Sequence, residues 1–405
     1  MGAGIVALVS LVPGLPKLPF MLVAVGLGVG AFFVHRTQTA AVALQAIEDA
    51  PALPTEPETP EQMLEMVVVD PIELEIGYSL IPMIDEDSND NLLRRITSIR
   101  RQLMSELGLI LPVVRIRDNL RLTPQAYRLK IRGQEVASGE IALDRLLAIP
   151  GSDSEEMQGT PTTEPAFGLP ALWVHESEQG QAELKGYTVV TPLSVLCTHL
   201  TETVRNSASE LLSRQLVQEM LNQLRQKAPA SVEGVIPEML NLGEVQSVLR
   251  NLLRERIPIR DLSGILEVLA NNAPMTRDPN ILAEAVRQNM AHTISSQYKD
   301  SANTLHVFTL APQLEATLRS SLVSSEGAPG FQIDAILAQR ILIKTGEQME
   351  ALAQLGFFPI LLCPRELRLA FRRLVEQSLP NLIVMAFSEV GQGTKVKAHG
   401  VVKMD

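Results

Sequence analysis

Aromatic residues and cysteines are scarce in this chain. Only 4% of its 405 residues are Phe, Trp or Tyr, whereas hydrophobic residues as a whole make up 46%. The core must therefore consist mainly of Leu, Val, Ile and Ala, and this composition favours a helix-rich protein. The two cysteines, Cys197 and Cys363, lie far apart and outside any CxxC spacing. The sequence therefore predicts neither a disulfide framework nor a thiolate metal site.

An excess of basic charge is also missing, as are catalytic motifs. The chain has 46 acidic and 35 basic residues, a net charge of −11, which argues against nucleic acid as a main partner because phosphate binding needs clustered Lys and Arg. The six histidines form no HExxH pattern, and there is no GxSxG elbow, phosphate-binding loop or strand-borne GxGxxG. We therefore predict no catalytic residue, no metal site and no cofactor. His199 is interpreted as structural rather than as a general base. A binding scaffold is favoured, with a membrane-anchored enzyme as an alternative.

The N-terminal 36 residues are predicted to be a membrane segment. Residues 18–34 form an apolar run of about 17 residues, just long enough for a helix to cross a hydrocarbon core of roughly 30 Å. His35 and Arg36 follow this run, and the positive-inside bias would then place the downstream chain in the cytoplasm. A secretory signal peptide is the less favoured alternative, because the positive charges follow the first apolar stretch and residues 13–16 (PGLP) interrupt it.

Residues 37–69 are predicted to be a linker. The segment begins with a helix-compatible stretch and then becomes rich in Pro and Glu, with four prolines between residues 51 and 60. Prolines at this density prevent a continuous helix and favour extended geometry. The segment is interpreted as a solvated tether, with partial ordering against a neighbouring subunit as the alternative.

Periodicity predicts a folded α+β chain from residue 70 onward. Residues 72–76 alternate as a half-buried strand does, and residues 92–107 place apolar side chains at helical spacing until Gly108. Helical patterns dominate after Pro192. The other expected helices cover 243–255, 261–271, 279–296, 312–322, 333–355 and 365–378. Further strands are expected at 110–116, 127–131, 171–176, 184–190, 305–310, 360–363 and 382–387. The alternation after residue 305 predicts a mainly parallel or mixed sheet.

Five short sequence words occur in order between residues 164 and 262. They are EPAFGLPALWV at 164–174, GYTVV at 186–190, THL at 198–200, ELLSRQ at 210–215, and LRNLLRE at 249–255 running into PIRDL at 258–262. Their order and spacing closely resemble the cytoplasmic region of the FlhA family. Members of this family are the large export-gate subunits of the flagellar type III secretion apparatus, and the family includes the export gates of virulence injectisomes.

This resemblance implies a multidomain organisation of the chain. A first α/β domain would be interrupted by a small α/β insertion and followed by a helical domain and a C-terminal α/β domain. The predicted boundaries are 70–142 plus 192–211, 143–191, 212–296 and 297–405. Family members carry further membrane helices upstream, so we expect this chain to represent the C-terminal part, with its last transmembrane helix at about 18–34.

The resemblance also implies a docking site for export chaperones that carry flagellar subunits. It would be a hydrophobic dimple between the first domain and its insertion, formed by Pro150, Glu164, Phe167, Val190 and Thr198. Phe167 offers the large apolar contact that anchors interfaces, and Glu164 stands where the family usually carries Asp. The alternative is that the Phe167 ring belongs to the core.

The remaining expectations concern partners. Arg100 and Arg101 are candidates for a docking or subunit contact, with a solvated cationic helix face as the alternative. Candidates for contacts between subunits in the helical domain are Arg254, Arg256 and Arg260. By resemblance, the chain would form a nine-membered homo-oligomeric ring at the bacterial inner membrane, with its globular part in the cytoplasm. Its other partners would be membrane proteins of the export apparatus and the ATPase complex. An injectisome export gate is the alternative to a flagellar one.

Overall fold

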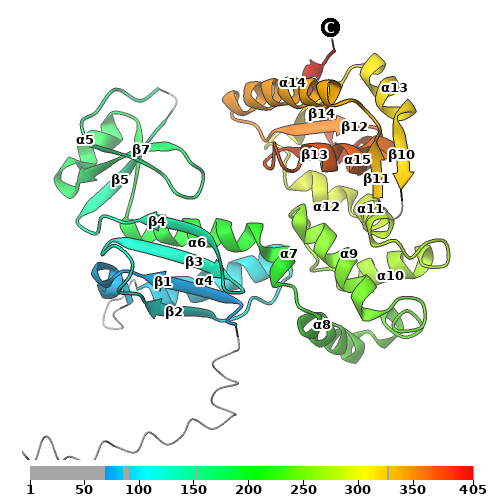
Figure 1. Ribbon diagram of the computed structural model, residues 1–405, viewed down its shortest axis with the longest axis horizontal. Helices are drawn as coiled ribbons and strands as arrows, with labels where there is room; N and C mark the ends of the chain where they lie inside the picture. The colour runs from blue at the N-terminus through cyan, green and yellow to red at the C-terminus, as the bar shows by residue number, and fades with distance from the viewer. Residues whose placement is uncertain (1–68, 85–90, 152, 326–327, 405) are drawn as a thin grey trace, which may run out of the picture. The chain divides into compact units, whose positions relative to one another are not determined.

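The computed structural model describes residues 69–84, 91–151, 153–325 and 328–404 (Figure 1). The contacts within the chain separate it into two units, and the second of these, Asp70–Asp405, is compact. The expected transmembrane helix and all but the last residue of the expected linker lie outside the described residues. Among the helices that the structure describes, none is long and apolar enough to cross a bilayer. The finer domain boundaries stay a prediction.

The first sheet has four strands in the order β2-β1-β3-β4. The predicted strand at residues 72–76 is confirmed as β1, with Ile72, Leu74 and Ile76 buried. The strand expected at 110–116 begins only at Val114, because Pro112 has no N–H for a sheet ladder. Strand β4 was not predicted, since its largely exposed sequence QEVASGE lacks an apolar alternation. The bounds are β1 (Ile72–Ile76), β2 (Val114–Asp118), β3 (Ala126–Ile131) and β4 (Gln134–Glu140).

Helices α4 (Leu92–Leu107) and α6 (Pro192–Asn206) pack against each other and share the aliphatic core of the first sheet. A 3₁₀ segment, η1 (Tyr78–Ile84), follows β1. The predicted end of α4 at Gly108 is confirmed. This residue has a φ of 77°, and a Cβ there would lie 2.4 Å from the backbone nitrogen of Arg260. Glycine is therefore required both for the left-handed cap and for this close approach.

The second sheet is antiparallel, in the order β6-β7-β5-β8. It has a small core of its own, in which Ala148, Val174 and Ala182 are buried. Strands near 171–176 and 184–190 were expected, whereas the strands formed by residues 145–150 and 160–163 were not. The bounds are β5 (Arg145–Pro150), β6 (Thr160–Thr163), β7 (Pro170–His175), η2 (Glu176–Glu178), α5 (Gln179–Leu184) and β8 (Tyr187–Val190).

From residue 208 to residue 296 the regular elements are all helices, joined by turns. The single helix expected at 279–296 is divided at Met290, where a ψ of 16° leaves the helical range. The other helices agree with the sequence patterns to within a few residues. The bounds are α7 (Ala208–Leu211), α8 (Arg214–Lys227), η3 (Pro229–Ser231), α9 (Leu242–Arg254), α10 (Leu262–Asn272), α11 (Pro279–Asn289) and α12 (Ala291–Ser296).

The third sheet is parallel, in the order β13-β12-β9-β14. Alternate side chains of its inner strands enter two different cores, one shared with the preceding helices and one with α13, α14 and α15. Burial on both faces explains why these strands are almost continuously apolar. Strand β14 and the hairpin β10–β11 were not predicted. The bounds are β9 (Thr304–Leu310), α13 (Pro312–Ser320), β10 (Leu322–Ser325), β11 (Ala328–Phe331), α14 (Ala335–Gln354), β12 (Ile360–Cys363), α15 (Arg365–Val375), β13 (Ile383–Ala386), η4 (Phe387–Glu389) and β14 (Lys395–Val402).

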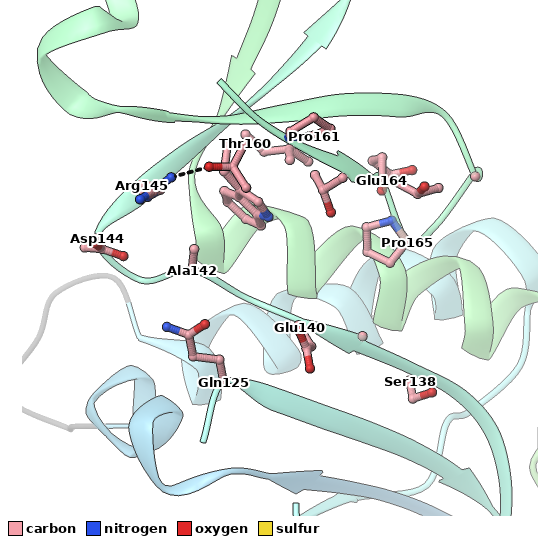
Figure 2. A pocket seen from close by; sticks show the side chains of 16 residues that line it. Gln125, Ser138, Glu140, Ala142, Asp144, Arg145, Thr160, Pro161, Glu164 and Pro165 are labelled. Carbon is pink, nitrogen blue, oxygen red and sulfur yellow. Dashed lines mark hydrogen bonds between the residues drawn. The ribbon is translucent and has the colours of Figure 1, made fainter. Parts of the chain in front are cut away.

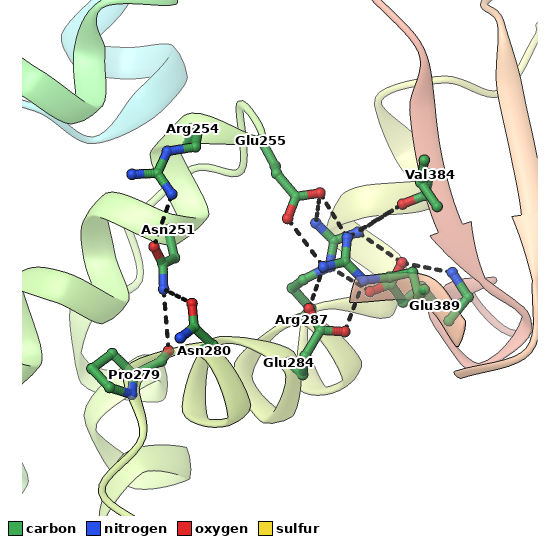
Figure 3. A network of polar contacts seen from close by, with 11 residues as sticks. Asn251, Arg254, Glu255, Pro279, Asn280, Glu284, Arg287, Val384 and Glu389 are labelled. Atoms are coloured by element: carbon green, nitrogen blue, oxygen red, sulfur yellow. Dashed lines mark hydrogen bonds and ion pairs between the residues drawn. The ribbon is translucent and has the colours of Figure 1, made fainter. Parts of the chain in front are cut away.

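Two buried arginines join the helices to the third sheet (Figure 3). Arg287 of α11 donates to Glu389 at 2.5 and 2.8 Å, and to Glu255 at 2.9 Å. Arg368 of α15 donates to Glu255 at 2.6 and 3.1 Å and to Glu284 at 2.8 Å. Burial alone would raise the pKa of Glu255, but Arg287 and Arg368 outweigh it and lower that pKa to about 2. We call these five side chains the arginine cluster.

We expect Arg368→Ala to lower the free energy of unfolding by about 3–5 kcal/mol, because Glu255 and Glu284 would lose the cation that offsets their desolvation. Urea denaturation measures this loss. The matched control is Arg319→Ala, which removes a half-exposed ion pair with Glu366 and should cost about 0–1 kcal/mol. Equal losses in the two variants would show that the cluster contributes no more than a surface pair.

Candidate functional site

A cleft of about 740 Å³ lies between the edge strands of the first two sheets, β4 and β6 (Figure 2). Its walls are mostly polar and include Glu140, Asp144 and Arg145, the last of which donates to the Thr160 hydroxyl at 2.6 Å. Leu147 and Trp173 also line it. This lining is more polar than the hydrophobic dimple expected from the sequence, and that dimple, between the first domain and its insertion, stays a prediction.

Glu164 shapes the turn that joins β6 to β7. Its carboxylate accepts hydrogen bonds from the backbone N–H groups of Ala166 at 3.0 Å and Phe167 at 2.7 Å. Its backbone N–H donates to the Leu169 carbonyl at 2.7 Å, and its carbonyl accepts from Gly168 at 2.9 Å. Glu164 is only 3% exposed. The charge is therefore held inside the turn by charge-assisted bonds rather than by water.

Phe167 occupies the same turn but faces solvent. It is 62% exposed, although Glu164 three residues earlier is buried. The alternative that Phe167 is a core residue is therefore wrong. It lies between Pro165 and Gly168, which both line the cleft. The φ of Gly168 is +71°, a conformation that glycine adopts without strain.

The other three predicted docking residues do not line this cleft. Pro150 pairs with Tyr187, and Val190 pairs with Leu147, in the ladder between β5 and β8. Thr198 is exposed on α6. Of the five predicted residues, the cleft lining therefore contains Glu164 alone, with Phe167 on the same turn. The common docking role of the five stays a prediction.

Tyr127 and His199 form a buried hydrogen bond beside the cleft. The Tyr127 hydroxyl lies 2.5 Å from Nδ1 of His199, and the two rings meet edge to face. Burial and the charge of Glu164 raise the pKa of Tyr127. Burial lowers the pKa of His199, and Glu164 offsets part of this effect. Both groups are therefore neutral at pH 7, with the phenol donating to the imidazole. This geometry agrees with the structural role predicted for His199.

Four of the five arginines predicted to contact subunits or partners form hydrogen bonds within the chain. The Arg100 guanidinium donates to the Leu111 carbonyl at 2.8 Å, and that of Arg256 donates to Asn206 at 2.5 Å. Weaker bonds of 3.4 Å join Arg254 to Asn251, and Arg260 to the Ser105 carbonyl. Arg101 is exposed on α4. These contacts hold parts of one chain together, and a role between subunits stays a prediction for all five arginines.

Two further features of the described residues concern chemistry. Within this part of the chain, no group of three or more His, Cys, Asp or Glu side chains is arranged to hold a metal ion. Both cysteines are buried and outside any disulfide, and burial raises the pKa of the Cys363 thiol.

Sequence reasoning missed some of the residues that build the cleft. Gly139 lies on a strand that carries no apolar alternation, and Thr160–Thr163 form a short strand of Thr and Pro. The turn between β6 and β7 carried the one available sequence signal, the motif EPAFG at residues 164–168.

We expect the stability of the protein to fall as the pH is lowered from about 7.5 to about 5.5, in part because of His199. Its pKa is lowered in the folded state, so the unfolded chain binds more protons below about 6.5. His199→Asn keeps an acceptor for Tyr127 but cannot be protonated. Urea denaturation at both pH values should therefore show a smaller loss for the variant. An equal loss in both proteins would contradict a lowered pKa at this position.

Comparison with known proteins identifies the family of this chain. A sequence profile described as the FHIPEP family matches residues 1–395. The protein named flagellar biosynthesis protein FlhA of Bacillus subtilis is 37% identical over 377 residues, covering 93% of this chain and 56% of that protein. The protein of the same name in Escherichia coli is 36% identical over 406 residues, covering 99% of this chain and 57% of that protein. The chain thus spans somewhat more than half the length of these relatives.

Solved structures show the same fold. The CdsV protein of Chlamydia pneumoniae has a TM-score of 0.75 at 23% identity, with 83% of this chain and 98% of that chain covered. The nonameric EPEC SctV-C has a TM-score of 0.69 at 20% identity, covering 82% and 98%. The resemblance noted in the sequence words is confirmed, and the chain belongs to the FHIPEP family, alongside the FlhA proteins.

Proposed function

We propose that this chain is part of an export gate of the bacterial flagellar type III secretion apparatus. Membership of the FHIPEP family supports this function, as do relatives 33–37% identical that are named flagellar biosynthesis protein FlhA. An injectisome export gate is the second candidate. It is favoured by structural neighbours such as the EscV cytosolic domain, which comes from a type III secretion system, but these share only 19–23% identity. The flagellar relatives are more similar in sequence.

The same proposal extends to assembly and place. The EPEC SctV-C and EscV structures are described as nonameric, and CdsV was solved in complex with CdsO. By analogy, the present protein forms a nine-membered ring and contacts other components of the export apparatus. Its N-terminal apolar segment lies in the inner membrane, and its folded unit lies in the cytoplasm.

The proposed work of the folded unit is non-covalent capture of export chaperones with their subunit cargo. The observation that carries this proposal is the exposed Phe167 ring, on a turn fixed by a buried carboxylate and placed between two residues that line a large cleft. A rigid turn that exposes an aromatic ring can bind a partner without first ordering the loop, so less entropy is lost on binding. Large apolar side chains of this kind often dominate interface energies.

We expect Phe167→Ala to weaken the binding of flagellar chaperone–subunit complexes by roughly tenfold or more, because an aromatic anchor is lost. Isothermal titration of the unit of residues 70–405 measures the affinity. This unit is compact in itself, and relatives of the same extent have been solved as isolated cytosolic or C-terminal domains. The melting temperature should stay unchanged, since the ring is largely exposed.

Leu184→Ala is the matched control. Leu184 is 91% exposed at the end of α5, so its truncation removes apolar surface without touching the turn. It should leave the affinity unchanged. If Phe167→Ala binds as tightly as the unaltered protein, docking does not use this turn.

A further inference from the structure

The hydrogen bond between Tyr127 and His199 joins two elements that flank the cleft. Tyr127 belongs to β3, and its neighbour in the sheet, β4, forms one wall of the cleft. His199 belongs to α6, which follows directly after β8 of the second sheet. Both residues are buried, with exposures of 0% and 7%. The bond therefore bridges the first sheet and the helix that continues from the second.

Gly139 brings this bond close to the surface of the cleft. It lines the cleft and stands opposite Tyr127 in the ladder between β3 and β4. A Cβ at residue 139 would lie 2.6 Å from the Tyr127 hydroxyl oxygen. The Tyr127 ring thus packs over Gly139, in the space that the side chain of any other residue at position 139 would need.

Glu164, on the turn between β6 and β7, interacts electrostatically with the same pair. Its carboxylate is buried, and among the described residues no basic side chain forms an ion pair with it. Its charge acts on both Tyr127 and His199, raising the pKa of each. The turn that exposes Phe167 and the buried pair are therefore electrostatic neighbours, although they belong to different sheets.

We propose that Tyr127 and His199 are positioning residues for the docking turn. Their hydrogen bond fixes α6 against the first sheet, and with it the distance between β4 and the turn that holds Glu164 and Phe167. Gly139 is the residue that gives Tyr127 room to do so. This proposal rests on the proposed docking function, but its effect on the turn is measurable without any partner.

The test uses the unit of residues 70–405 and two readouts. Tyr127→Phe removes one oxygen and should weaken chaperone–subunit binding by up to roughly fivefold, because the free energy of one ordinary hydrogen bond limits what the lost positioning can cost. It should also shift the amide NMR resonances of Ala166 and Phe167, which donate to Glu164. His199→Asn, which retains an acceptor for the phenol, should restore most of the affinity that His199→Leu loses. Glu164→Gln should lower the pKa of His199, because the charge that raises it is removed.

Gly139→Ala tests the same idea without deleting a polar group. It should reproduce the effects of Tyr127→Phe, because the added methyl group displaces the hydroxyl. Gly180→Ala is its control, since a Cβ there meets nothing within 4 Å, and it should bind as the unaltered protein does. If the Gly139 variant does not fold, Tyr127→Phe still decides the question.

The outcomes separate this proposal from the docking function. If the unaltered protein binds and Phe167→Ala weakens binding, an unchanged affinity in folded Tyr127→Phe overturns the positioning role alone. If the unaltered protein does not bind at all, the docking function fails. The NMR readouts then decide the rest. Unshifted Ala166 and Phe167 amides overturn the coupling of the pair to the turn, and shifted amides support it.

Discussion

The arginine cluster is the constraint on which the C-terminal half of the structure depends. Arg287 and Arg368 are 3% and 0% exposed, and both bind Glu255. Arg287 also binds Glu389 at the end of the third sheet, and Arg368 also binds Glu284 of α11. Charges this far from water are tolerated only when every donor has a partner. One guanidinium cannot leave without stranding a carboxylate on another element. The helices and the third sheet are therefore held together by these ion pairs as well as by their shared aliphatic core.

The candidate docking site is built differently from the arginine cluster. It lies where two edge strands, β4 and β6, come near one another without pairing, and the cleft between them is polar. Its features come from a short turn in which Glu164 is buried and Phe167 is exposed. The buried carboxylate fixes the backbone, and the fixed backbone presents the ring. A neutral Tyr–His pair, next to Gly139 of the cleft wall, ties β3 to α6.

The sequence predicted the elements with strong periodicity and missed those without it. Helix α4 has apolar residues at regular helical spacing and a glycine cap, and its predicted and observed ends coincide. Strand β4 is mostly exposed and polar, and strand β14 is mostly exposed although it carries three valines. Their pairing is set by backbone hydrogen bonds to a neighbouring strand, and one segment alone does not reveal that partner. The site was predicted in the same uneven way. The word EPAFG marked the turn of Glu164 and Phe167, whereas Gly139 and Tyr127 carried no local sign of their closeness to it.

The sequence by itself determined the family, the composition of the core and the position of most helices and strands, because these depend on residues close together along the chain. Tertiary structure decided which of the five candidate residues share a cleft, and that the ring of Phe167 faces solvent. It also decided that Glu255, Glu284, Arg287, Arg368 and Glu389 meet in one buried cluster. These partners are separated by up to 113 positions, and only the packing of distant elements brings their charges within hydrogen-bond distance.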